Sequence, residues 1–334
     1  MAPAGESREE RVRRAFRAML TARALETKLA SLYKAGKIVG GVYIGPGQEA
    51  VSASLGTCLR KGRDLFAPLI RDQAGRTAFG EEMLDATRTY LGSVKGPTRG
   101  RDGNVHRGRP TEGLYTMISH LGAMVSVVVG GLMARKLKGT LEGTVGATSV
   151  GDGATSTGAF HEAMNLAAVE HLPLVVLLVN NQFAYSTPNS RQFACRSLVD
   201  RAVGYGIEGH EVDGTDLLSS FDIISEAVDR ARAGRGPQLV VATLLRLSGH
   251  GEHDDAFYVP EELKRSPIGR DCLVVAERSL LERGVVTAAE VAAWKAEAAR
   301  ESQAAVATAQ QEPPPDPYQD DWRTLSTPGL SEIH

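Results

Sequence analysis

The sequence lacks several features that mark whole classes of protein. It has three cysteines in 334 residues, and no two of them share the short spacing of a zinc or disulfide framework. Its longest apolar run, residues 172–179, is eight residues long, far short of the ~20 that a membrane helix needs. The N-terminus has no apolar signal segment, and acidic residues among its arginines argue against a transit peptide. The formal net charge is only −2. These absences predict a cytoplasmic protein that binds neither nucleic acid nor a membrane.

Short apolar stretches alternate with amphipathic ones along the chain. The segments 144–150, 172–179 and 238–245 are apolar on both faces, which is typical of strands in a parallel sheet covered on both sides. Helical patterns at 155–171 and 216–234 separate them. The alternation predicts an α/β fold with a doubly wound, mostly parallel sheet and helices on both faces. Further elements are expected as a strand over 64–70 and helices over 7–36, 80–92, 122–138 and 287–311, the last capped by Thr287.

Two polar clusters follow strands of this predicted sheet. Gly151-Asp152-Gly153 follows one strand and precedes a helix, and Asn180-Asn181 ends the next strand. Open α/β sheets bind ligands beyond the carboxyl ends of their strands, and a helix N-terminus offers free N–H groups to an anion. The carboxylate of Asp152 would repel that anion unless a hard cation such as Mg²⁺ lay between them. Because the amide of Asn181 can approach the same point, the pattern predicts a divalent metal on a diphosphate.

No internal repeat and no strong linker divides the chain. We expect an N-terminal helical arm over 1–45, a diphosphate-binding α/β domain over 46–285, and a C-terminal helix with an extended tail over 286–334.

Other motifs for phosphate and metal are incomplete. "GATSTGAF" lacks the Lys-Ser/Thr of a P-loop, and "HEAMN" has an asparagine where a zinc protease needs its second histidine. Several alternatives stay open at this point. Asp152 could be only a helix N-cap, and Arg71 could form a surface ion pair. His250-x-x-His253 with the two following aspartates could bind a metal. The arginines of 99–109 could contact phosphate or a partner.

The Gly-Asp-Gly, the 26 residues that follow it and the Asn-Asn resemble the signature of thiamine-diphosphate enzymes. The wider sequence, over roughly residues 10–325, resembles the α subunit of the E1 component of 2-oxo acid dehydrogenase complexes, of the pyruvate or branched-chain type. The stretches that carry this resemblance are "GPGQEAV", "FHEAMNLAAVEHLPLVVLLVNNQFAYSTP", "YGIEGHEVDGTD" and "RLSGHGEHDD".

The resemblance implies roles for particular residues. Mg²⁺ would be held by Asp152, Asn181 and the backbone carbonyl of Phe183. The other implied positions all serve the thiamine diphosphate: backbone contacts from Gly153 and Ala154, charge from Arg71 and Arg246, a backbone contact to the aminopyrimidine from Leu121, and His250 as the catalytic group beside the reacting carbon.

The chain departs from the family pattern at three positions. Ile70 replaces a tyrosine, Gly251 replaces a serine that is phosphorylated in some members, and Val259 stands where arginine often follows tyrosine. These departures bear on substrate identity and on regulation more than on cofactor binding.

The resemblance also implies an activity and its partners. The activity is oxidative decarboxylation of a 2-oxo acid, with acyl transfer to the lipoyl group of the E2 acyltransferase. Since the chain has one diphosphate module and no assignable glutamate for the aminopyrimidine, it should work only with a β subunit, in an α2β2 tetramer. The alternatives are a subunit of a split acetoin-cleaving or other thiamine-dependent enzyme, and a non-catalytic paralogue that binds a partner.

Overall fold

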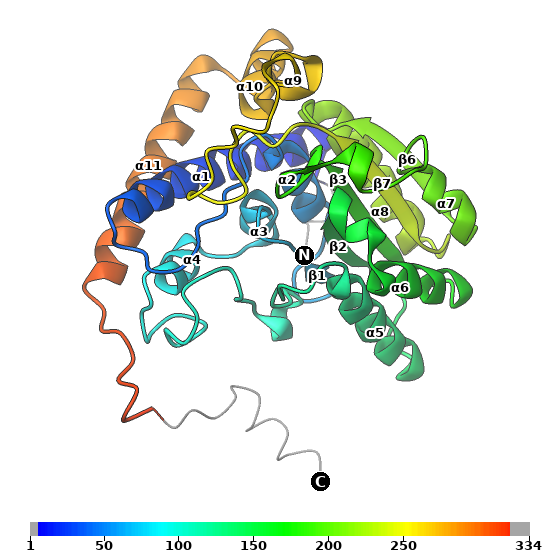
Figure 1. Cartoon of the computed structure of the whole chain (residues 1–334), viewed down its shortest axis with the longest axis horizontal. Coiled ribbons are helices and arrows are strands. Elements are labelled where there is room, and N and C mark those ends of the chain that lie inside the picture. The colour runs from blue at the N-terminus through cyan, green and yellow to red at the C-terminus, as the bar shows by residue number, and fades with distance from the viewer. Residues whose placement is uncertain (1–5, 321–334) are drawn as a thin grey trace.

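The centre of the molecule is a parallel β-sheet, seen in a computed structural model that describes residues 6–320 (Figure 1). Its five strands have the order β1-β2-β3-β7-β6, and each pair of neighbours is parallel. The strands are β1 Leu65–Ala67, β2 Gly146–Gly151, β3 Leu174–Asn180, β6 Glu208–Asp213 and β7 Gln238–Thr243. A small antiparallel pair, β4 Phe183–Ala184 and β5 Thr187–Pro188, follows β3. The predicted α/β class is confirmed.

Helices cover both faces of the sheet because its inner strands alternate between two apolar clusters. In β3, Val175, Leu177 and Val179 belong to one cluster, whereas Val176 and Leu178 belong to the other. The first cluster includes side chains of α1, α2, α8 and α10, and the second includes those of α5 and α6. Figure 1 shows these two helical layers on either side of the strands. A sheet buried on both faces explains why its strands are apolar throughout.

The helices are α1 Arg8–Lys34, α2 Glu49–Cys58, α3 Gln73–Phe79, α4 Met83–Tyr90, α5 Ala123–Leu137, α6 Gly158–Val169, α7 Asp200–Tyr205, α8 Leu217–Arg232, α9 Glu261–Lys264, α10 Cys272–Glu282 and α11 Ala288–Gln310. Short 3-10 turns are η1 Pro110–Glu112, η2 Asp152–Ser156, η3 Asn189–Arg191 and η4 Pro267–Gly269. The expected cap of α11 is present: the Thr287 hydroxyl accepts the N–H of Glu290 at 3.2 Å, and the Glu290 carboxylate accepts the N–H of Thr287 at 2.8 Å.

Several elements differ from expectation. The strand expected over 64–70 is only three residues long, and the helix expected from 155 is preceded by η2. Strand β6 was not expected, because this edge strand buries only Val212 and otherwise carries polar or small residues. The extended tail expected at the end of the segment 286–334 lies mostly outside the described residues. Within residues 6–320, none of the helices combines the length and the apolar character that membrane crossing requires.

Candidate functional site

The two polar clusters leave neighbouring strands at the same edge of the sheet. Gly151, the last residue of β2, is in register with Val179 of β3, so Asp152 and the Asn180-Asn181 pair emerge side by side. Strand β4 then folds back over η2. A Cβ added to Gly153 would lie 2.5 Å from the Cβ of Ala184, so only glycine permits this close approach.

Asp152 has the environment of a ligand whose partner is a cation. Its side chain is buried, and its Oδ1 accepts the N–H of Gly153 at 2.7 Å. Its Oδ2 is buried without a hydrogen-bond partner among the described residues. Burial raises the pKa of Asp152 to about 6, although the N–H of Gly153 and the Gln192 side chain favour the ionised form. The helix-cap alternative fails, because Thr157 caps α6. A buried carboxylate oxygen left unpaired calls for an ion or a proton.

The turn after β3 supplies two more oxygens close to this carboxylate. The Asn181 Oδ1 accepts only a long bond of 3.5 Å from the N–H of Phe183, and the Phe183 carbonyl accepts one of 3.4 Å from Arg246. Gln182 has a φ of 78°, and its backbone N–H favours the ionised form of Asp152. A carboxylate, an amide oxygen and a carbonyl together form a donor set that suits Mg²⁺. The residues present therefore fit the expected metal.

Two buried arginines bring positive charge to the same region. Arg71 and Arg246 are 6% and 4% exposed. Arg71 donates to the carbonyls of Ile44 at 2.9 Å and His250 at 2.5 Å, and Arg246 donates to the carbonyl of Tyr185 at 2.8 Å. In the described part of the chain, every hydrogen bond of these two guanidinium groups goes to a neutral group.

The surface ion pair considered for Arg71 is therefore wrong. Burial and the charge of Arg246 lower the pKa of Arg71 to about 9, and an arginine in a protein nevertheless stays charged. Two buried cations that form no ion pair within residues 6–320 are costly, so the arrangement fits an anion such as a diphosphate.

His250 lies against Arg71 and between two aromatic rings. Its ring centroid is 5.3 Å from that of Tyr43 and 4.5 Å from that of Tyr185, and its backbone N–H donates to Oδ2 of Asp254 at 2.6 Å. Burial and the two arginines lower the pKa of His250 to about 4, so the imidazole is neutral near pH 7. Sequence reasoning missed both tyrosines as site residues, although Tyr43 adjoins the glycine-rich "GPGQEA" and Tyr185 follows the Asn-Asn turn closely.

The metal cluster considered at His250 and His253 is not formed. Residues 6–320 contain no group of three or more His, Cys, Asp or Glu side chains that could hold a metal ion. Asp254 is occupied instead by the N–H of His250 and by the hydroxyl of Tyr258, which donates to it at 2.6 Å.

Leu121 reaches the site from the start of α5. Its side chain is 62% exposed, and its carbonyl accepts the hydroxyl of Thr157 at 3.4 Å. Thr157 in turn donates to the carbonyl of Ala154 at 2.8 Å, so Leu121 lies next to the turn that carries Asp152. The N–H of Gly153 is already engaged by Asp152.

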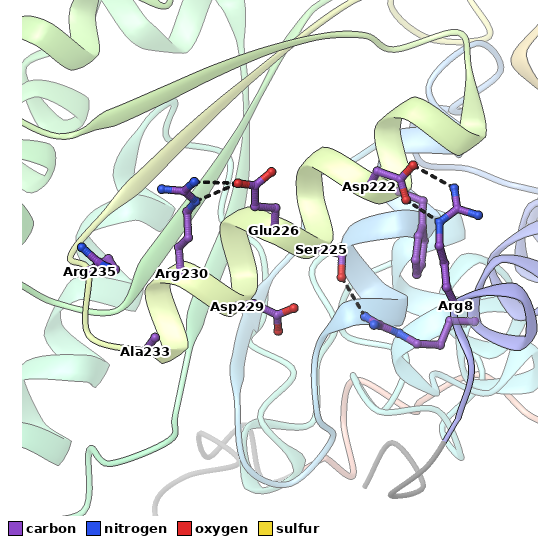
Figure 2. A pocket seen from close by; sticks show the side chains of 10 residues that line it. Arg8, Asp222, Ser225, Glu226, Asp229, Arg230, Ala233 and Arg235 are labelled. Carbon is purple, nitrogen blue, oxygen red and sulfur yellow. Dashed lines mark hydrogen bonds and ion pairs between the residues drawn. The ribbon is translucent and has the colours of Figure 1, made fainter.

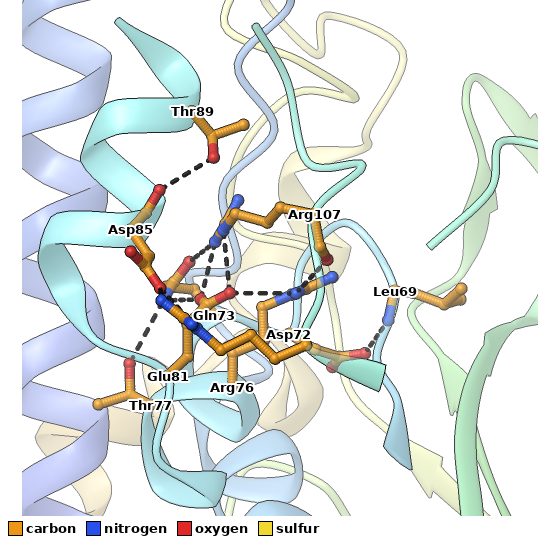
Figure 3. A network of polar contacts seen from close by, with 10 residues as sticks. Leu69, Asp72, Gln73, Arg76, Thr77, Glu81, Asp85, Thr89 and Arg107 are labelled. Atoms are coloured by element: carbon orange, nitrogen blue, oxygen red, sulfur yellow. Dashed lines mark hydrogen bonds and ion pairs between the residues drawn. The ribbon is translucent and has the colours of Figure 1, made fainter. Parts of the chain in front are cut away.

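The arginine-rich segment 99–109 contains a buried anchor, which argues against a phosphate patch there. Arg107 donates to both oxygens of Glu81 at 2.9 Å and to Gln73 at 2.7 Å, and Arg76 donates to the carbonyl of Arg107 at 3.2 Å (Figure 3). Gln73 and Arg76 belong to α3, which begins two residues after Arg71. The network therefore ties the arginine-rich segment to the element that positions Arg71.

A surface hollow lies elsewhere, between α1 and α8 (Figure 2). It has a volume of about 680 Å³ and contains ion pairs such as Arg8 with Asp222 at 2.6 Å and Arg230 with Glu226 at 2.7 Å. None of the predicted site residues lines it. The predicted site is instead a set of strand-end turns with one exposed side, near Leu121.

Comparison with known proteins gives consistent matches. Residues 17–318 match the family model described as dehydrogenase E1 component. The α subunit of acetoin:2,6-dichlorophenolindophenol oxidoreductase from Cupriavidus necator is 34% identical over 303 residues, which is 90% of each chain. The α subunit of 2-oxoisovalerate dehydrogenase from Bacillus subtilis is 31% identical over 81% of this chain and 82% of its own. The α subunit of the pyruvate dehydrogenase E1 component from Rickettsia felis is 30% identical over 85% of this chain and 86% of its own.

Proposed function

Because this chain belongs to the dehydrogenase E1 component family, we propose that it is the α subunit of an enzyme that decarboxylates a 2-oxo acid oxidatively and passes the acyl group to the lipoyl arm of an E2 acyltransferase. Thiamine diphosphate is the general cofactor of the family, and α subunits imply a β partner. The observation that carries the proposal is a buried carboxylate oxygen that has no hydrogen-bond partner, in the same region as two buried arginines whose hydrogen bonds all go to neutral groups. This holds for the described residues. Such a site can hold a cation at the carboxylate and an anion at the arginines.

The chain's own residues divide the work of holding the cofactor. Asp152, Asn181 and the Phe183 carbonyl would bind Mg²⁺, and Arg71 would bind the diphosphate. Arg246 adds charge and also donates to the carbonyls of the turn after Asn181, so it positions that turn. When bound, thiamine diphosphate supplies the electron sink that decarboxylation requires.

His250 is suited to moving a proton at the proposed cofactor site. Its low pKa keeps it a neutral imidazole, which can accept a proton and can donate one only after it has been protonated. A bound diphosphate would offset the charge of Arg71 and raise the pKa of His250 toward its ordinary range. The imidazole would then be able to exchange protons near neutral pH, at the stage where the acyl group leaves for the lipoyl arm.

The exposed side of the site offers a surface for the β subunit. Apolar side chains are exposed at its rim and along α5 and α6: Leu121, Val127, Leu137, Leu166 and Val169. The two glycines Gly130 and Gly131 of α5 face different surroundings. A Cβ on Gly131 would lie 2.9 Å from Leu65, whereas one on Gly130 would meet no atom within 4 Å. Apolar surface of this kind is typical of protein interfaces.

The test is reconstitution with the β subunit, followed by a decarboxylation screen with an artificial electron acceptor. Pyruvate, 2-oxobutyrate, 3-methyl-2-oxobutanoate and acetoin are the substrates. We expect turnover of a 2-oxo acid that requires Mg²⁺ and thiamine diphosphate. In a second assay, with lipoylated E2 acyltransferase in place of the artificial acceptor, His250→Ala should retain cofactor binding and lose acyl transfer, and unchanged transfer would contradict the role of His250.

Acetoin cleavage is the second candidate, because the acetoin relative matches this chain over 90% of both lengths. Turnover of acetoin without turnover of any 2-oxo acid would favour it. Cofactor binding without turnover of any of the four compounds would favour a non-catalytic paralogue.

A further inference from the structure

Two buried carboxylates lie beneath the loop of residues 43–47. This loop borders the proposed cofactor site, since the carbonyl of Ile44 accepts a hydrogen bond from Arg71. Glu26 of α1 accepts the N–H of Gly45 at 3.0 Å, and Glu49 of α2 accepts the N–H of Gly47 at 2.8 Å. The loop is therefore held from below by two carboxyl groups, both on helices that belong to the core.

The fit around this loop is tight. A Cβ on Gly45 would lie 2.3 Å from the carbonyl of Arg71 and 3.5 Å from Oε1 of Glu26. Gly45 is thus clamped between the glutamate and the arginine segment. Any shift of Glu26 has to move the backbone against Arg71, because protein interiors are close-packed.

The two carboxyl groups differ in what neutralises them. Glu49 forms an ion pair with Arg23, whose Nε lies 2.5 Å from its Oε1. Glu26 has no comparable partner: its Oε2 is buried and makes no hydrogen bond within residues 6–320. A buried, unpaired charge is costly, so the neutral form of Glu26 is favoured.

The titratable groups that face Glu26 come from four segments of the chain. They are Arg23 on α1, Glu49 on α2, Arg71 after β1, and the Tyr90 phenol on α4. Burial and then the charge of Glu49 raise the pKa of Glu26 well above its usual range, while Arg23 and Arg71 act in the opposite direction. Arg71 is the member of this set that also faces the proposed diphosphate.

We propose that Glu26 is a proton-coupled positioning residue for the diphosphate: in its neutral form it holds loop 43–47 against Arg71 and leaves the charge of Arg71 for the anion. This inference rests on the proposed function. An ionised Glu26 would compete with the diphosphate as the counter-ion of Arg71. Binding therefore takes up a proton wherever Glu26 is ionised beforehand, and affinity falls as pH rises through the pKa of the unliganded state.

The test compares Glu26→Gln, Glu26→Ala and a control, Glu301→Gln, which changes an exposed residue of α11. Each variant is reconstituted with the β subunit and titrated calorimetrically with thiamine diphosphate in Mg²⁺, from about pH 6 to about pH 9. Two buffers of different ionisation enthalpy give the number of protons taken up. Infrared spectra of the cofactor-free complexes show whether a protonated carboxyl band disappears in Glu26→Gln.

The wild-type complex and the control should take up as much as one proton at the alkaline end, and their affinity should fall there by up to about tenfold per pH unit. Glu26→Gln keeps an acceptor for Gly45, so it should bind at acidic pH like the wild type but without the uptake or the fall. Glu26→Ala should bind more weakly at every pH. Other titrating groups are common to all variants and cancel in the comparison.

The same uptake and pH slope in Glu26→Gln as in the wild type would overturn the proposal. So would an infrared spectrum in which no protonated carboxyl band depends on Glu26. If the wild-type complex binds no thiamine diphosphate, the proposed function has failed instead, and the infrared comparison still decides the protonation of Glu26.

Discussion

Asp152→Asn should make the metal-free protein more stable while abolishing its metal site. The pKa of Asp152 rises from an ordinary 3.8 to about 6, so an ionised Asp152 lowers the free energy of unfolding by about 3 kcal/mol at pH 8. The sign follows from linkage. A carboxyl whose pKa is raised in the folded state has no cost below its unfolded pKa, and the cost grows until pH exceeds the folded pKa.

Asparagine has nearly the size of aspartate and carries no charge. The variant should therefore gain about 3 kcal/mol over the wild type at pH 8 and about half of that at pH 5, apart from a constant offset from the amide. Urea unfolding in the presence of EDTA at both pH values measures this difference. Asp229→Asn, at an exposed position on α8, is the matched control.

Two results would refute the reasoning about Asp152. A stability difference that is equal at both pH values would mean that the carboxyl is not desolvated in the fold. Retention of Mg²⁺-dependent thiamine diphosphate binding by the variant, measured by calorimetry with the β subunit present, would remove Asp152 from the metal site.

Three further predictions concern the surroundings of this carboxyl. Gly153→Ala should weaken Mg²⁺-dependent cofactor binding, because its Cβ would collide with Ala184 on β4; unchanged affinity in a titration would mean that β4 moves freely. Arg107→Leu should lower the free energy of unfolding by up to about 3 kcal/mol, since it leaves buried Glu81 with only the longer ion pair to Arg76 at 3.3 Å; thermal unfolding that shows no loss would contradict this. The pKa of His250, about 4 in the cofactor-free chain, should rise on diphosphate binding; an NMR titration that shows no rise would separate His250 from the anion.

Residues near strand ends were open to prediction because their placement follows from local rules. Parallel strands that are apolar on both faces can be recognised from their sequence, and their carboxyl ends meet at one edge of the sheet. Asp152 and Asn181 could thus be placed together from the sequence. Whether they bind Mg²⁺ stays a prediction, which the unpaired Oδ2 of Asp152 supports.

Other parts of the site could not be placed by such rules. Arg71 and His250 had to be transferred from the family resemblance, since they lie in irregular segments 179 residues apart that only tertiary packing brings into contact. The edge strand β6 was missed because one of its faces is exposed, so it lacks the apolar run of the inner strands.

The sequence by itself determined the alternation of strands and helices, the family and the two strand-end clusters, because each depends on residues close together in the chain. Only the tertiary structure decided which charges are compensated. Arg107 and Glu49 form ion pairs in the fold, whereas Arg71 and Glu26 are buried and form no ion pair among the described residues. Compensation depends on burial and on contacts between distant segments, and neither is written in any local pattern.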